Sequence, residues 1–385
     1  MNIHRATIGE TRPLVENHPQ ATPFVLSRPD ATVIATGRAA THPTSSAAAD
    51  ALRSGTASHV VGALPFDPND RAALWTPDSF DITDGPLHTP DTPRPFPRIT
   101  VDAPEPSTDE HLRRVRSAIE VMSAADTTLD KVVLARAVRL AATDPVSAVA
   151  LLERLVARDS LGNGFCVDLS DAGREHAGTA LVGSSPELLV RRRGGVVECH
   201  PLAGSAPRHP DPATDRETGA RLLDSAKNLR EHAFVVEQVR AALAPLCDQI
   251  SVPSTPELTS TPKLWHLGTP ITATVRDSEV TALDLAVAMH PTPAICGTPT
   301  AQAKDLITEL EGERGFYAGA VGWAGADGDG EWMVSIRCAR LSADRRFLHA
   351  YAGGGIIAES DPDAELAETT TKLGTMLAAL GITED

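Results

Sequence analysis

Three charged residues near the C-terminus have a spacing that could bind a metal ion and an anion. Glu365 and Glu368 are three positions apart and Lys372 follows Glu368 by four, so all three share one stripe of a helix. Paired carboxylates supply the oxygen ligands that Mg²⁺ prefers, and a nearby lysine suits an anionic ligand. The alternative is a solvated surface row whose single i,i+4 ion pair contributes about 0.3–0.5 kcal/mol.

A second set of polar residues lies in the middle of the chain. Glu231 belongs to the charged segment 227–232, which precedes an apolar run, so it could face a site or lie at an exposed helix end. A turn at Gly204 and Ser205 could direct backbone N–H groups at a carboxylate. Ordinary helix ends and turns produce the same patterns, so neither segment identifies a site by itself.

Two titratable residues adjoin apolar strands and could exchange protons with a substrate. Lys131 opens an almost wholly apolar run, where a lysine shielded from water can act as a general base. A lysine at such a junction can instead extend its ammonium group to the surface. Glu187 lies between two apolar runs, and a partly buried carboxyl tends to stay protonated, as a general acid must. A plain loop glutamate is the alternative.

Three consecutive glycines, Gly353 to Gly355, follow another strand-like run. Glycine exposes the backbone and tolerates positive φ, so another group could approach the main chain closely there. A nucleotide-binding loop is the obvious rival, but neither G-x-x-x-x-G-K-[ST] nor G-x-G-x-x-G occurs at this segment. We therefore do not expect nucleotide binding.

Apolar periodicity predicts the helices that would position these residues. They are 107–122, a helix starting at Asp144-Pro145, the stretch 215–246 with a break near Lys227, and 361–380. Ser107, Asp144 and Ser360 have the spacing expected of N-caps.

Short β-type runs account for most of the remaining regular structure. They are 25–26, 32–34, 60–64, 131–140, 164–169, 180–182, 188–191, 196–199, 317–323, 332–336 and 347–351. The proline-dense stretch 86–106 is predicted to be a loop or arm that crosses the surface. Strands and helices do not alternate regularly, so the fold class is predicted to be α+β.

Composition excludes several classes of protein. The 385 residues are 42 % hydrophobic, which permits a large core, and the formal net charge of −16 disfavours a nucleic-acid partner. The five cysteines are scattered without a C-x-x-C pair, which argues against disulfides and zinc and suits the cytoplasm. No apolar run approaches the roughly 20 residues that span a bilayer. We expect a leader at 1–20, N-terminal strands and a proline-rich arm at 21–106, and the main region at 107–385.

These segments together resemble the chorismate-utilising enzymes. The resemblance is strong from about residue 108 to the end of the chain, fainter at 60–66 and absent from the first 20 residues. It implies an α+β fold of the anthranilate synthase component I type, with two β-sheets packed as a sandwich, helices around them and the active site between them. The matching motifs are KVVLAR (131–136), GSSPE (183–187), PLAGS (201–205), SAKNLREH (225–232), LWHLGTP (264–270), HPTPAICG (290–297), GFYAG (315–319), GEW (330–332), IRCA (336–339), GGGI (353–356) and ELAE (365–368).

The resemblance also implies roles for individual residues. Lys131 matches the general base that activates water for attack at C2 of chorismate, and Glu187 matches the general acid that protonates the departing C4 hydroxyl. Glu231 and Glu368 match Mg²⁺ ligands, with Glu365 as an outer carboxylate near the metal's waters. Substrate contacts are implied for Gly204, Ser205, His266, Ala294, Ile295, Tyr317, Arg337, Gly353 and Lys372.

Within this family, the residues are most similar to isochorismate synthases of siderophore and menaquinone pathways. Lys131 favours water over ammonia as the nucleophile, so no glutaminase partner is expected, and Trp265 and Ile336 fit the same group. Tyr317 and Tyr351 occur where salicylate synthases often carry tyrosine, so pyruvate elimination to salicylate is the alternative activity. A non-catalytic paralogue that binds a neighbouring enzyme is the minor alternative. We expect a cytoplasmic, monomeric enzyme.

Overall fold

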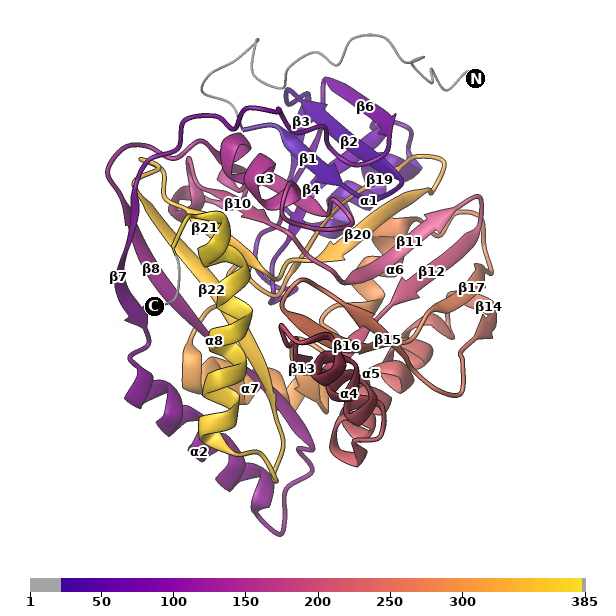
Figure 1. The fold of residues 1–385 in the computed structure, drawn as a ribbon. Coiled ribbons are helices and arrows are strands. Elements are labelled where there is room, and N and C mark those ends of the chain that lie inside the picture. Colours follow the sequence, from indigo (N-terminus) through magenta and orange to yellow (C-terminus); the bar gives the residue numbers. More distant parts are fainter. Residues whose placement is uncertain (1–21, 383–385) are drawn as a thin grey trace.

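The computed structural model describes residues 22–382, so the leader predicted at 1–20 lies outside the described residues. Two large antiparallel sheets and one small sheet form the centre of the molecule, and helices cover the outer sides (Figure 1). Strands and helices are interspersed without regular alternation. This architecture confirms the predicted α+β class and the predicted sandwich.

The first large sheet has ten strands drawn from all parts of the described chain. Its longest pairing joins β22 to β8 over ten residues, with Phe347 opposite Ala141 and Ile356 opposite Val132. Along the sheet the order is β18 (Gly297–Thr298), β8 (Lys131–Ala142), β22 (Phe347–Ile356), β21 (Cys338–Leu341), β10 (Ala180–Gly183), β9 (Gly164–Asp168), β1 (Phe24–Ser27), β2 (Ala31–Thr36) and β6 (Ser79–Asp84), and β7 (Ile99–Glu105) also pairs with β8.

The second large sheet has nine strands, and a separate sheet of three strands lies beside it. The order in the nine-stranded sheet is β14 (Cys247–Ser251), β17 (Ile271–Val275), β12 (Val196–His200), β11 (Leu188–Arg193), β20 (Gly330–Val334), β19 (Ala320–Gly325), β4 (His59–Leu64), β5 (Ala73–Thr76) and β3 (Ala40–His42). The small sheet contains β13 (Leu202–Pro207), β16 (Leu264–Gly268) and β15 (Glu257–Ser260).

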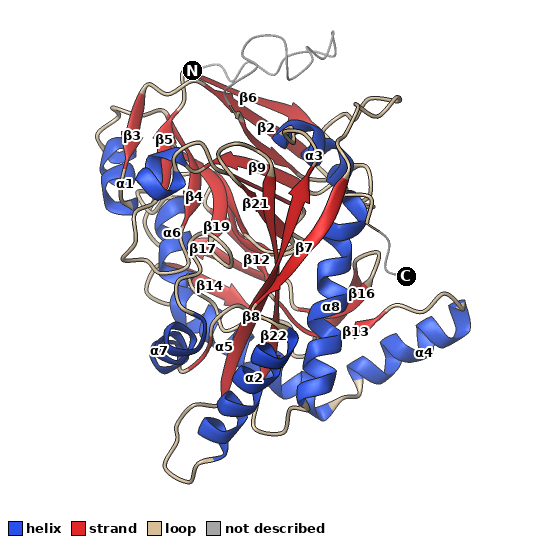
Figure 2. Cartoon of the chain, turned by 90° about the vertical axis from the view of Figure 1, so that its left-hand side faces the viewer, coloured by secondary structure: helices blue, strands red, loops and turns tan. Residues whose placement is uncertain are grey.

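Eight α-helices of the described chain pack around these sheets, on both sides of the strands (Figure 2). α8 lies along β22, whereas α6 lies against β11, β19 and β20 of the other sheet. The helices are α1 (Ser45–Arg53), α2 (Thr108–Ser123), α3 (Ala148–Val156), α4 (Pro212–Leu223), α5 (Ala226–Leu243), α6 (Ala282–Met289), α7 (Thr300–Glu311) and α8 (Pro362–Ala379), with short 3₁₀ turns at Ser170–Ala172 and Arg174–His176.

Two hydrophobic cores follow from this layering. The larger core contains buried residues of both large sheets, such as Leu134 and Val190, and so fills the space between them. The smaller core joins the ten-stranded sheet to α3 and α8 through residues such as Leu348, Leu152 and Leu373. The ten-stranded sheet is therefore buried on both faces in the region of β22, which fixes α8 against it.

Every strand-like run predicted from the sequence overlaps a strand, but one predicted loop is wrong. Residues 99–105 form β7, which pairs with β8, and only the preceding part of 86–106 is irregular. Pro104 is tolerated because β7 pairs with β8 alone, so the edge position needs no N–H donor there. The pairing also joins the two parts of the chain that meet near residue 106.

Two predicted helix caps are also wrong, although the helices themselves are present. Ser147, not Asp144, caps α3 and accepts a hydrogen bond from the backbone N–H of Ala150. Asp361, not Ser360, caps α8 through its contact with Ala364. In both cases a second suitable side chain lies nearby, and at α8 the Ser360 hydroxyl bonds Ile357 N and Glu365 Oε1 instead. The predicted cap at Ser107 and the break near Lys227, between α4 and α5, are confirmed.

No helix within residues 22–382 is long and apolar enough to cross a membrane. All five cysteines are buried and free.

Candidate active site

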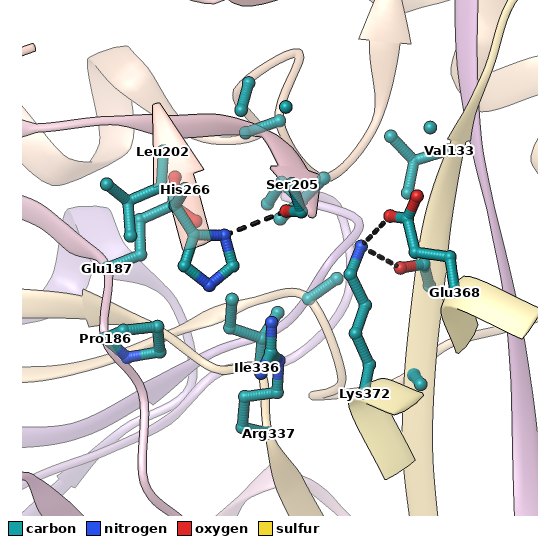
Figure 3. Close-up of a pocket in the computed structure, with 18 of the residues that line it drawn as sticks. Val133, Pro186, Glu187, Leu202, Ser205, His266, Ile336, Arg337, Glu368 and Lys372 are labelled. Carbon is teal, nitrogen blue, oxygen red and sulfur yellow. Dashed lines mark hydrogen bonds and ion pairs between the residues drawn. The ribbon is translucent and has the colours of Figure 1, made fainter. Parts of the chain in front are cut away.

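A cleft of about 730 Å³, counting space open to solvent, lies between α8 and the segments that connect the two large sheets (Figure 3). Twelve of the fourteen side chains predicted to form a site line it. They are Glu187, Gly204, Ser205, Glu231, His266, Ala294, Ile295, Tyr317, Arg337, Gly353, Glu368 and Lys372.

The other two predicted site residues, Lys131 and Glu365, lie just behind the lining. Lys131 is 1 % exposed, and its Nζ is 2.8 Å from Oε1 of Glu231, so its ammonium group does not extend to the surface. Glu365 is 3 % exposed, and its Oε1 accepts hydrogen bonds from Ser360 Oγ at 2.8 Å and Lys227 Nζ at 3.3 Å. Both residues reach the cleft only through their neighbours.

One side of the cleft holds its charges as ion pairs, and we call it the paired wall. It consists of Lys131 with Glu231 and Lys372 with Glu368, whose Nζ–Oε1 distances are 2.8 and 2.5 Å. Lys372 also donates a hydrogen bond to the carbonyl oxygen of Gly353 at 2.8 Å. Glu368 and Lys372 line the cleft, so the alternative of a solvated surface row on α8 is wrong.

The glycines of β22 make room for the acidic side chains. A Cβ atom at Gly355 would collide with Oε1 of Glu231, and one at Gly354 would lie 3.2 Å from Oε2 of Glu365. These glycines sit inside a strand and none of them has positive φ. The predicted close approach to the backbone is therefore confirmed, whereas the idea that positive φ requires these glycines is wrong.

Two connections between the large sheets form the opposite side of the cleft. Residues 184–187 join β10 of the first sheet to β11 of the second, and residues 335–337 return from β20 to β21. The two connections are hydrogen-bonded to each other, from Ser184 N to Arg337 O at 3.1 Å and from Val334 N to Glu187 O at 3.1 Å. Glu187 and Arg337 thus reach the same cleft although they are far apart in the chain.

We call this side the unpaired wall, and it consists of Glu187, His266 and Arg337. Within the described chain these three side chains form no ion pair, and no hydrogen bond of the Arg337 guanidinium is found. Burial raises the pKa of Glu187 to about 7, although a backbone contact with Leu202 and the surrounding cations oppose this effect. Burial also lowers the pKa of Arg337. Glu187 is therefore partly protonated near neutral pH.

His266 is positioned by the small sheet. Its Nδ1 is 2.8 Å from Oγ of Ser205, the residue opposite it in the β13–β16 ladder, and its Nε2 is buried without a partner among the described residues. Burial, followed by the nearby cations, holds the pKa of His266 well below its usual value, so the ring is neutral. The predicted Gly204-Ser205 turn is wrong, because this segment is strand β13 with an irregularity at Gly204, where φ is +80°.

The remaining predicted contacts come from irregular segments. Tyr317 stacks on Tyr351 with ring centroids 4.9 Å apart, and burial raises its pKa, so the phenol stays neutral. Arg314 positions the loop that contains Ala294 and Ile295, because its Nη1 donates to the carbonyl oxygen of Ile295 at 2.9 Å. The same guanidinium forms a buried ion pair with Glu311, Nη2 to Oε1, at 2.7 Å.

The acidic residues of the paired wall have the chemistry of a site for a hard cation. Carboxylate oxygens from α5 and α8 face the cleft, and Oε2 of Glu365 is buried without a hydrogen-bond partner among the described residues. No group of three or more His, Cys, Asp or Glu side chains within residues 22–382 is arranged to hold one metal ion. Two direct carboxylates with water completing the coordination is a pattern that Mg²⁺ accepts, so the donor set fits this ion.

The sequence did not predict the remaining residues of the cleft lining, which are apolar or glycine. These residues are Val133, Pro186, Leu202, Ala203, Ala318, Ile336, Ala352 and Gly355. The strand period offered one usable signal, because Val133 shares a face of β8 with Lys131, two positions earlier. The others carry no chemical signature, and only their neighbours in sequence among the predicted residues could have suggested them.

Comparisons with known proteins place the chain in a family. Residues 49–381 match the family model described as chorismate binding enzyme. The chain is 51 % identical to a Mycobacterium tuberculosis protein named as a proposed isochorismate synthase, MenF, over 99 % of this chain and 100 % of that protein. It is 43 % identical to the isochorismate synthase DhbC of Bacillus subtilis, over 84 % of this chain and 81 % of that protein.

A solved structure shows the same fold. It is the crystal structure of a proposed 2,3-dihydroxybenzoate-specific isochorismate synthase, DhbC, from Bacillus anthracis, with a TM-score of 0.87 and 35 % identity over 95 % of this chain and 98 % of that chain. The family match, the full-length relative and this structural likeness all lead to one assignment. The chain belongs to the chorismate binding enzyme family.

Proposed function

We propose that this protein is an isochorismate synthase, which interconverts chorismate and isochorismate by attack of water at C2 and loss of the C4 hydroxyl. The observation that carries the proposal is the cleft in which the buried, readily protonated carboxyl of Glu187 lies across from the Lys372–Glu368 pair (Figure 3). The relatives named above carry the same activity in their names and match most of this chain. A dianionic ring fits a cleft with acid–base groups on its two sides.

Binding a dianion requires local cations because the whole chain carries a formal charge of −16. Arg337 supplies one such charge without an acidic partner among the described residues, and Lys372 supplies another at the cleft surface. A guanidinium group forms two parallel hydrogen bonds to a carboxylate, which orients the ligand as well as binding it. Arg337 and Lys372 are therefore assigned to the substrate carboxylates, with His266 and Tyr317 beside the ring.

Glu187 is assigned the role of general acid. Its burial supports this role, because a pKa of about 7 leaves a substantial fraction of the carboxyl protonated at neutral pH. A protonated carboxyl can donate its proton to the departing C4 hydroxyl as the C–O bond breaks. Ionised Glu187 would instead repel the dianion.

Lys131 is assigned the role of general base, acting on the water that attacks C2. It is enclosed by protein and held by Glu231, so it has a fixed position and little access to bulk solvent. In the ion pair with Glu231 its ammonium group has no free lone pair, so Lys131 must first lose one proton before its neutral amine can accept a proton from the attacking water. Acid and base on different sides of the ring allow attack and departure to be coupled.

The carboxylates of the paired wall are assigned to Mg²⁺. Glu231 and Glu368 would hold the ion directly, and Glu365 would hold waters that surround it. When bound, Mg²⁺ would supply a positive charge that anchors a substrate carboxylate and stabilises charge developing on the ring.

The decisive experiment is a product analysis. Purified protein is incubated with chorismate and Mg²⁺, and the products are separated by chromatography with standards for isochorismate, salicylate and pyruvate. We expect isochorismate without stoichiometric pyruvate. Salicylate with equal pyruvate would establish the alternative synthase instead, and no conversion under any Mg²⁺ or pH condition would overturn the proposal.

A further inference from the structure

Two residues beside the cleft hold a backbone conformation that side chains disfavour. Ala318 has φ +58° and Arg337 has φ +50°, and neither is glycine. The left-handed region costs free energy for such residues, so surrounding contacts must hold them there. Both line the cleft, in the turn before β19 and in the connection from β20 to β21.

Ser335 joins these two segments. It is 0 % exposed and outside the cleft lining, and its Oγ donates a hydrogen bond to the carbonyl oxygen of Phe316 at 2.6 Å. Its backbone N donates to Gly319 O at 2.9 Å, and its carbonyl oxygen accepts from Ala318 N at 3.0 Å. Any residue could form the two backbone bonds, so the hydroxyl bond is the part that requires serine.

The carbonyl oxygen of Phe316 has little else to bind. Its other contact is the backbone N of Gly319 at 3.3 Å, which is long for a hydrogen bond. Loss of the Ser335 hydroxyl therefore leaves this carbonyl poorly satisfied and weakens the attachment of the turn that carries Tyr317 and Ala318, which the two backbone bonds alone would then hold.

The orientation of Arg337 depends on its backbone. Its guanidinium has no ion pair or hydrogen bond among residues 22–382, so nothing at the end of the side chain fixes it. The main chain is held by the bond from Ser184 N to Arg337 O at 3.1 Å and by the attachment of Ser335, two residues earlier. The Ser335 hydroxyl thus acts on two parts of the cleft at once.

We propose that Ser335 is a positioning residue, whose hydroxyl holds Arg337 and Tyr317 in the arrangement that binds the substrate dianion. The identity of that dianion rests on the function proposed above. Contacts to carboxylates that do not react are equally strong in the ground state and the transition state, so their loss changes binding more than turnover. Removing the hydroxyl should therefore raise KM and leave kcat nearly unchanged.

The test compares Ser335→Ala with Ser27→Ala, a matched control. Ser27 is also 0 % exposed, and its Oγ donates to the carbonyl oxygen of Gly162 at the same 2.6 Å, but it lies on β1 outside the cleft lining. Its Oγ also accepts a hydrogen bond from the backbone N of Leu87 at 2.8 Å. We expect Ser335→Ala to raise KM for chorismate about tenfold, the effect of roughly one hydrogen bond, with kcat within about twofold. Ser27→Ala removes two buried hydrogen bonds, so it should lower the melting temperature at least as much as Ser335→Ala does and still leave KM unchanged.

Each outcome separates the role of Ser335 from the proposed function. A wild-type enzyme that makes no isochorismate defeats the function, whereas an active wild type with unaltered KM in Ser335→Ala defeats only the positioning role. Equal changes of KM in both serine variants would show a general loss of packing and also defeat it. If Ser335→Ala does not fold, Ser335→Cys, whose thiol is a weaker donor, should give a smaller rise in KM, and no rise would overturn the proposal.

Discussion

The two sides of the cleft treat charge in opposite ways. On the paired wall every lysine has a carboxylate within 2.8 Å, so each charge is balanced by a neighbour of the protein itself. On the unpaired wall, burial sets the protonation of Glu187 and His266, and Arg337 keeps its charge without a partner among the described residues. The difference shows where a ligand must contribute charge and where it need not.

A buried charge without a partner costs free energy, so the unpaired wall is costly unless a ligand completes it. Arg337 gains most from an anion, because its hydrogen-bond donors face the cleft without protein acceptors among the described residues. On the paired wall each carboxylate already has a lysine beside it, so the protein itself balances much of that charge. The comparison therefore predicts that variants on the two walls fail for different reasons.

The largest effect is expected from breaking the paired wall at Lys131. Lys131→Met should lower kcat about 10³-fold through loss of the general base. It also leaves Glu231 buried without its partner, so the free energy of unfolding should fall by about 3 kcal/mol. Chromatography of the products measures the first effect and urea unfolding the second.

The double variant Lys131→Met/Glu231→Gln is the control for Lys131→Met. It removes both charges, so most of the stability should return while the activity should not. Unaltered turnover in the single variant would contradict the base assignment, and recovery of turnover in the double variant would contradict it equally.

The next effect tests whether the carboxylates of the paired wall bind Mg²⁺. Glu368→Gln should weaken Mg²⁺ binding about 100-fold, because it removes a charged ligand. Isothermal titration with Mg²⁺ measures this without any need for turnover. Asp363→Asn, on the exposed face of the same helix, is the control and should bind Mg²⁺ as the wild type does. Equal affinities of all three proteins would remove Glu368 from the metal site.

A smaller effect on turnover, about 10²-fold, is expected from Glu187→Gln on the unpaired wall. Wild-type kcat should decrease as the pH rises through about 7, where Glu187 loses its proton, and the variant should lack this decrease. A pH profile of kcat from pH 5.5 to 9 checks both statements. An identical descending limb in the variant would assign the titration to another group.

The raised pKa of Glu187 also predicts how the free energy of unfolding depends on pH. Because burial raises its pKa to about 7, folded Glu187 keeps a proton that the unfolded chain releases near its ordinary pKa. The folded state therefore binds more protons between these values, and stability falls as the pH rises through this window. Glu187→Gln should flatten that fall, as measured by urea unfolding at pH 4.5, 6 and 7.5. A fall of the same size in the variant would contradict this cause.

The smallest effect is expected at Lys227, whose Nζ is 3.3 Å from Oε1 of Glu365. The Lys227 side chain is 43 % exposed. Water screens such a pair, so Lys227→Met should change the free energy of unfolding by less than about 1 kcal/mol. Removing a positive charge near the carboxylates should strengthen Mg²⁺ binding, by less than about threefold. Weaker Mg²⁺ binding in the same titration would contradict the sign.

Local patterns in the sequence predicted much of the fold and the site. Every strand-like run overlaps a strand, because short β-branched and apolar runs bounded by turn residues favour the extended conformation. The row Glu365, Glu368 and Lys372 could be placed on one stripe of a helix from its spacing alone. The family motifs named the site residues, and twelve of the fourteen line one cleft.

Spacing could not show which way that stripe faces. Glu365 is buried because α8 packs on β22. Gly354 and Gly355 of β22 leave room for the carboxylates of Glu365 and Glu231. The formation of β7 also depended on a distant contact, its pairing with β8, whereas the caps of α3 and α8 were chosen between neighbouring polar residues. Each of these errors concerns a competition between local options that local sequence leaves nearly balanced.

By itself, the sequence determined which segments become strands and helices and which side chains have the chemical type for acid–base or metal chemistry, because these depend on residue type and on periods of two to four residues. Only the tertiary structure decided that Glu187 and Arg337 meet across two connections between sheets, that Lys131 lies behind Glu231, and that one wall is paired and the other is not. Those features depend on contacts between residues far apart in the chain, and burial then sets the protonation states that local sequence leaves open.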